Sequence, residues 1–166
     1  QIDFTDDDIR KLCSLISKER LDSGYGSWLD IGICLKNLSD NYLKIWIEIS
    51  KKCKGFDENE CKEKWKTFKK NKNGLKIGSL IKWAKEDNEK KLSAFMKERK
   101  IMIFIEKNKD KFPNNNLEIT KIISNNDYHC IKLGDDYCPI IERAHKGSNN
   151  IFLELTPYEL VMKCSK

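Results

Sequence analysis

The sequence predicts a mainly α-helical fold, a small helical bundle followed by a small α+β part at the C-terminal end. Two observations predict it. Up to about residue 110, apolar side chains recur three and four positions apart, the spacing of helices that bury one face. After Pro113 the pattern changes to short strand-like runs separated by Asn, Asp and Gly. We therefore expect a helical domain over residues 1–110 and a β-containing segment over residues 111–166, with the boundary near residues 110–116.

Six helices are expected in the first part, and several begin at a recognisable N-cap. Thr5, followed by three aspartates, starts a helix that is expected to run to about Leu21. Ser39 caps the third helix, and Asp57 with Glu60 three residues later starts the fourth. The expected ranges after the first helix are 27–38, 39 to about 49, 57 to about 68, 79–86 and about 89–109, and the expected strands are 117–123, 128–133, 151–155 and 160–162.

The composition excludes some classes of protein. The chain has 166 residues, and no stretch approaches the roughly 18 consecutive apolar residues of a membrane helix. No signal peptide precedes Gln1, so we expect neither a membrane protein nor a secreted precursor. The sequence has no phosphate-binding loop with the Gly-Lys-Ser/Thr ending, and we find no complete catalytic set. The acidic run at residues 6–8 is interpreted as a helix start rather than a metal site.

The net charge of +6 is concentrated in one segment. Residues 51–76 contain 10 Lys against four acidic residues. Such a patch is typical of surfaces that neutralise phosphates, so we expect single-stranded DNA or a primer–template as a partner. The alternative is a solvated lysine-rich face. The lysines expected to contact phosphates are Lys62, Lys66, Lys69, Lys70 and Lys72.

The four tryptophans have helical spacing and are interpreted as core residues. Base stacking is more plausible for aromatic residues outside the apolar stripes, near the lysines, such as Tyr25 and Phe56.

Cysteine and histidine cluster near the C-terminal end. Seven cysteines without a secretory signal argue against a disulfide framework. Cys138, His145 and Cys164 have spacings that a hairpin could bring together around zinc, which stabilises modules too small to build a core. The fourth ligand is left open among Cys130, His129 and a residue beyond Lys166. The alternative is a set of buried thiols in a small β layer.

Four ordered segments resemble a known family. They are GSWLDIGICLKNL at 26–38, IWIEIS at 45–50, FDENECKEKW at 56–65 and GLKIGSLIKWAK at 74–85. Together they are similar to the helical domain that follows the polymerase core in viral and phage primase-helicases, most of all in large nucleocytoplasmic DNA viruses. In that group an archaeo-eukaryotic-type primase precedes the domain and a superfamily-three helicase follows it.

The tail carries a second resemblance. CPIIERAHKGSNN at 138–150, followed by a strand and a Lys-Cys step at 163–164, is similar to the zinc knuckle of eukaryotic primase-polymerases and herpesvirus-type primases. The resemblance implies that Cys138, His145 and Cys164 are zinc ligands and that the knuckle takes part in primer initiation. The family pattern has one more Cys a few residues later, which this sequence lacks.

These resemblances imply a non-catalytic segment of a viral DNA primase-helicase. It would link the primase and helicase modules of one polypeptide, assist template or primer binding during replication, and act at viral replication sites in the host cytoplasm or nucleus. The parent would be a nucleotidyltransferase and ATP-dependent helicase that assembles as a hexamer. The alternative function is a protein-interaction spacer or oligomerisation collar without nucleic-acid contact, for which the apolar run 101–105 is the sequence support.

Overall fold

The computed structural model describes residues 3–108, 110, 119–125, 128–133, 137–138, 143–144, 151–155 and 160–164. The chain divides into two compact units, Gln1–Phe95 and Met96–Lys166, which are described separately below. No helix in the described part is long and apolar enough to cross a membrane. The domain boundary expected near residues 110–116 falls almost entirely on residues outside these ranges and remains a prediction.

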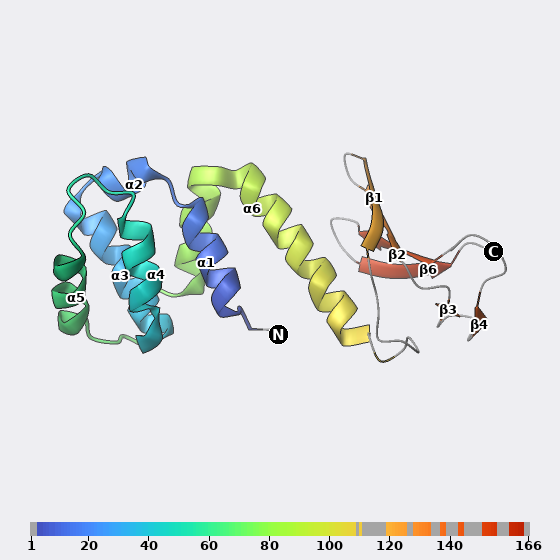
Figure 1. Cartoon of the computed structure of the whole chain (residues 1–166), viewed down its shortest axis with the longest axis horizontal. Helices are drawn as coiled ribbons and strands as arrows, with labels where there is room; N and C mark the ends of the chain where they lie inside the picture. The colour runs from blue at the N-terminus through green and yellow to red at the C-terminus, as the bar shows by residue number, and fades with distance from the viewer. Residues whose placement is uncertain are drawn as a thin grey trace. The chain divides into compact units, whose positions relative to one another are not determined.

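Helices make up the first unit, as the sequence predicts (Figure 1). The helix α3 contacts α2, α4 and α5, and α4 also contacts α1 and α5. The elements are α1 (Asp6–Leu15), α2 (Lys18–Asp22), α3 (Tyr25–Leu38), the 3-10 helix η1 (Asp40–Tyr42), α4 (Leu43–Ser50), α5 (Glu58–Thr67) and α6 (Ile77–Asn108), the last of which continues into the second unit.

The predicted first helix, from Thr5 to about Leu21, is in fact two helices. Thr5 caps α1 through a capping box with Asp8, as expected. The chain then leaves the helical conformation at Ile16, and the Ser17 side chain caps α2 by accepting the backbone N–H of Arg20. The backbone N–H of Ser17 donates to the carboxylate of Asp87, 2.9 Å away. This partner lies 70 positions away in sequence, so local periodicity does not reveal the break.

The two helices expected at 79–86 and 89–109 form α6, which starts earlier, at Ile77. The backbone of Asn88 is non-helical, with φ −154° and ψ 56°, and the helix is kinked there. Asp87, next to the kink, accepts a bidentate pair of bonds from the Arg20 guanidinium in addition to the Ser17 N–H. These bonds fix the first part of α6 to α2.

Aromatic rings fill the centre of the helical unit. Trp46 is fully buried and its ring centroid lies 4.7 Å from that of Trp28, 5.7 Å from that of Trp65 and 5.2 Å from that of Phe68. A Cβ on Gly32 would lie only 2.5 Å from the Trp46 ring, so the absence of a side chain there lets α3 approach α4. The interpretation of the tryptophans as core residues is confirmed for Trp28, Trp46 and Trp65, whereas Trp83 is only partly buried.

Within its described residues, the second unit has two antiparallel sheets besides the end of α6. One has the strand order β1-β2-β5-β6, and the other pairs β3 with β4. The four strands predicted from the sequence correspond to β1, β2, β5 and β6; the short β3 and β4 were not predicted. The bounds are β1 (Ile119–Asn125), β2 (Tyr128–Leu133), β3 (Tyr137–Cys138), β4 (Arg143–Ala144), β5 (Ile151–Leu155) and β6 (Leu160–Cys164).

Candidate nucleic-acid interface

The helix α5 carries much of the lysine-rich segment, and its start is defined locally. Gly55 has φ +70°, a left-handed conformation that favours glycine, and it turns the chain after α4. The Asp57 side chain then accepts the backbone N–H groups of Asn59 and Glu60 and caps the helix. Cys61 and Trp65 are buried against the bundle. Lys62 and Lys66 therefore lie on the remaining, solvent-exposed part of the helix.

The five lysines predicted to contact phosphates are all exposed. Three of them are in ion pairs: Lys62 with Glu58 at 2.7 Å, Lys66 with Glu63 at 2.7 Å and Lys70 with Asp40 at 2.6 Å. No ion pair of Lys69 or Lys72 is found within the described residues. Surface ion pairs of this kind contribute little free energy and exchange readily, so they leave a positive surface in place.

Other lysines of the same segment have structural contacts. The ammonium group of Lys52 donates to the carbonyl oxygens of Ser14 and Ile16, both at 3.1 Å, and so satisfies the C-terminal end of α1. Burial lowers the pKa of Lys52. The ammonium group of Lys64 lies 5.6 Å from the ring centroid of Tyr25. Some lysines of the segment are therefore exposed to solvent, whereas Lys52 and Lys64 take part in the packing of the fold.

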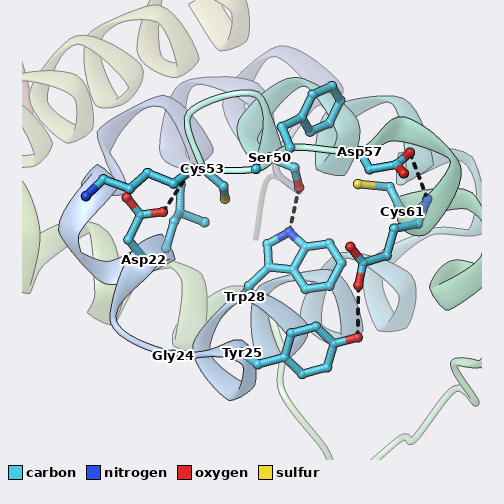
Figure 2. Close-up of a pocket in the computed structure, with 13 residues that line it drawn as sticks. Asp22, Gly24, Tyr25, Trp28, Ser50, Cys53, Asp57 and Cys61 are labelled. Carbon is cyan, nitrogen blue, oxygen red and sulfur yellow. Dashed lines mark hydrogen bonds between the residues drawn. The ribbon is translucent and has the colours of Figure 1, made fainter.

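A pocket of about 350 Å³ lies between the end of α2, the start of α3, the loop after α4 and the start of α5. Figure 2 shows Trp28 at its centre, with the indole N–H donating to the Ser50 hydroxyl at 2.8 Å. Tyr25, half of whose surface is exposed, and Phe56 also line the pocket. Sequence reasoning singled out these two aromatics but did not predict the pocket, because its lining comes from two distant stretches of the chain, residues 21–28 and 50–61.

The predicted metal ligands are described only in part. Cys138 lies on β3 and pairs with Arg143, Cys130 lies on β2, and Cys164 ends β6. His145 is outside the described residues. Within the side chains that the structure describes, no group of three or more His, Cys, Asp or Glu is placed to hold a metal. The zinc assignment remains a prediction.

The helical unit matches a known domain family. Residues 9–84 match the family described as Primase C terminal 2 (PriCT-2). This range covers the Trp stack, the pocket and the lysine-rich segment, and it starts within α1 and ends in the first part of α6.

Two viral relatives named "Putative helicase" were also found. The protein from Acanthamoeba polyphaga mimivirus is 30% identical over 83 residues, which cover 49% of this chain and 8% of the relative. The protein from Invertebrate iridescent virus 6 is 32% identical over 97 residues, which cover 53% of this chain and 10% of the relative. The chain thus spans a tenth or less of the length of these relatives, and no solved structure matches it. The match to the Primase C terminal 2 (PriCT-2) family is thus confined to residues 9–84, a little under half of the chain.

Proposed function

We propose that the chain is a non-catalytic segment of a viral DNA primase-helicase, in which it joins the primase and helicase modules and holds template or primer during replication. The domain match and the two viral relatives support this role. The observation that carries the nucleic-acid part is the exposed lysine patch, defined as Lys62, Lys66, Lys69, Lys70 and Lys72. Such a patch binds the phosphates of a single strand by releasing counterions.

The test is binding of a fluorescent single-stranded oligonucleotide, measured by anisotropy over a series of salt concentrations. A variant with Lys69→Ala and Lys72→Ala removes the two patch lysines for which no ion pair is found in the described residues. We expect weaker binding and a salt slope that is less negative by about 1.4, because each phosphate contact contributes about 0.7 for single strands.

The matched control replaces Lys90 and Lys91, which are exposed on α6, by alanine. It changes the net charge by the same amount outside the patch. Equal weakening by both double variants would mean that only the overall charge matters. Binding that does not respond to salt or to the patch variant would exclude the phosphate role.

A second candidate function is an oligomerisation collar, as expected of a hexameric parent. The apolar run 101–105 gives it limited support, since Ile101 is buried whereas Met102 is 56% exposed. Light scattering coupled to gel filtration separates the two: a collar assembles at micromolar concentration without DNA, whereas a binding module remains monomeric.

Zinc binding in the second unit is a further part of the proposal, with Cys138, His145 and Cys164 as ligands. The β3–β4 pairing supports it, because Ala144, which directly precedes His145, pairs with Tyr137, next to Cys138. Thiolate and imidazole are the donors that structural zinc prefers, and the metal would stabilise a unit with a small core.

Cys130 is the weaker candidate for the fourth ligand. It pairs with Glu154 on β5, whereas Cys164 pairs with Ile151. The two cysteines are therefore two strands and three rows apart, on the order of 14 Å at about 4.8 Å per strand and 3.3 Å per residue. Two thiolates that bind zinc at about 2.3 Å do not span that distance.

Native mass spectrometry tests the zinc proposal. We expect one zinc on the chain, loss of zinc in Cys138→Ser and Cys164→Ser, and its retention in Cys130→Ser. Absence of zinc from the unmodified chain, or loss in Cys130→Ser alone, would contradict the ligand assignment.

A further inference from the structure

The pocket at the start of α5 has walls that suit a flat apolar group. The rings of Tyr25 and Trp28 have centroids 5.4 Å apart and planes inclined by 45°. Trp28 is 8% exposed, and its one polar atom, the indole nitrogen, is already hydrogen-bonded to Ser50. The surface of Trp28 that faces the pocket is therefore apolar. Tyr25 and Phe56 reach the surface. A planar side chain can therefore stack on aromatic carbon without leaving a polar protein atom unsatisfied.

The charge of the pocket is opposite to that of the chain. Three carboxylates line it, those of Asp22, Asp57 and Glu60, against one ammonium group, that of Lys54. Figure 2 shows Asp22 and Asp57 on opposite sides of the cavity, with Tyr25 between them along its lower edge. Asp22 forms an ion pair with Lys18 at 3.3 Å, so Asp57 and Glu60 supply the negative charge that a ligand in the pocket would meet, and this charge favours a cation.

Two of these carboxylates each have an oxygen available for a ligand. Asp57 uses Oδ1 to cap α5, and Glu60 uses Oε1 to accept the Tyr25 hydroxyl at 3.3 Å. For the second oxygen of each, no hydrogen bond is found within the described residues. The Tyr25 ring already has the Lys64 ammonium group over it, from a residue outside the pocket lining, which shows that its face accepts a cation.

We propose that this pocket binds an arginine side chain from a basic, extended segment of a protein partner. The guanidinium group is planar and stacks on aromatic rings, and it binds carboxylates through two parallel N–H groups. Aromatic walls and carboxylates at the mouth match both properties. The inference is independent of DNA binding by the lysine patch, because none of the patch lysines lines the pocket.

The test is an NMR titration of the ¹⁵N-labelled 166-residue chain with a capped pentapeptide, Gly-Ser-Arg-Ser-Gly. Otherwise identical peptides carry citrulline, which has nearly the same shape without the charge, or lysine. We expect the arginine peptide to shift the Trp28 indole N–H and the backbone amides of Gly24 and Gly55, and to bind about tenfold more tightly than the citrulline peptide. Equal binding of arginine and citrulline, or tighter binding of lysine, would overturn the proposal.

Deoxyguanosine and its 5′-monophosphate are titrated in parallel, because a nucleobase also stacks on aromatic rings. Shifts of the same signals at lower concentrations of either compound than of the arginine peptide would assign the pocket to a base and refute the proposal.

Glu60→Gln and Glu63→Gln form a matched pair of variants. Each removes one negative charge from α5, but Glu63 is outside the pocket lining and pairs with Lys66. The amide oxygen of glutamine at position 60 can still accept the Tyr25 hydroxyl. We expect Glu60→Gln to weaken arginine-peptide binding about fivefold or more and Glu63→Gln to leave it unchanged. If Glu60→Gln perturbs the spectrum of the free protein, Tyr25→Leu serves instead, and unchanged affinity in that variant would refute the stacking.

Discussion

Replacement of Gly32 by alanine tests the close approach of α3 to the aromatic stack. The added Cβ would lie 2.5 Å and 2.7 Å from two atoms of the Trp46 ring and 2.8 Å from an atom of the Phe68 ring. These are rigid rings, and Trp46 is itself enclosed by Trp28 and Trp65. The alanine can therefore be accommodated only if a ring or the helix backbone moves.

The expected change in the free energy of unfolding combines two opposing effects. Overpacking a core in this way costs about 1–3 kcal/mol. Alanine in place of glycine inside a helix gains about 1 kcal/mol. Gly26 lies in the same helix, and a Cβ there would meet no atom within 4 Å, so Gly26→Ala has the gain without the clash. We expect Gly32→Ala to be less stable than Gly26→Ala by about 1–3 kcal/mol.

Urea unfolding followed by tryptophan fluorescence measures this difference. All four tryptophans lie within residues 1–95, so the signal reports on the helical unit. The midpoint is expected to fall for Gly32→Ala and to rise slightly for Gly26→Ala, with an unchanged dependence on urea. Equal stabilities of the two variants would refute the inferred packing of α3 against the Trp46 ring.

Three further predictions concern single side chains. Burial raises the pKa of Asp87, but the hydrogen bonds from Arg20 and Ser17 outweigh this effect and lower the pKa overall. The carboxylate therefore stabilises the folded state fully at pH values above the pKa of Asp in the unfolded chain, about 3.9. Asp87→Asn is expected to lower the free energy of unfolding by about 1–3 kcal/mol at pH 7. In urea unfolding, the difference between variant and unmodified protein should disappear as the pH falls through the pKa of Asp87 in the folded state. A difference that does not change with pH would contradict this role. Thr5→Ala removes the α1 capping box and should lower the unfolding free energy by about 1 kcal/mol, whereas an unchanged midpoint would mean that the cap is not formed. In iodoacetamide labelling followed by peptide mapping, Cys53 should react before the buried cysteines of the helical unit, which are Cys13, Cys34 and Cys61. Burial raises the pKa of Cys13 and Cys34 to about 12, so little of the reactive thiolate forms. Equal labelling rates would contradict this order.

Features that depend on neighbours in sequence were predicted well. Thr5, Ser39 and Asp57 were identified as caps, and each accepts a backbone N–H two or three residues later, although Ser39 caps the 3-10 helix η1 and not α4. The four longer strands were also located, because alternating apolar residues and Asn or Gly turns mark them directly. The position of the kink in α6 lies in the gap that was left between two predicted helices.

Features that depend on distant partners were not predicted. The break after α1 is held by Asp87, whose carboxylate accepts the backbone N–H of Ser17 from 70 positions away in sequence. Counting charges along the sequence located the lysine-rich segment but did not predict its ion pairs, since Asp40, the partner of Lys70, is 30 positions away. Long-range contacts of this kind have no local signature in the sequence.

The helix α5 carries two surfaces of opposite charge, and one substitution separates them. Glu60 lines the acidic pocket, whereas Lys62, two positions later, is turned by about 200° around the helix. Removing the Glu60 charge makes this region more positive. Glu60→Gln should therefore weaken binding of the arginine peptide while leaving single-stranded DNA binding unchanged or tighter. Anisotropy and NMR titrations of the same variant at one salt concentration provide the comparison. If both affinities fell together, the pocket and the lysine patch would be one surface for one ligand, and their assignment to different partners would be wrong.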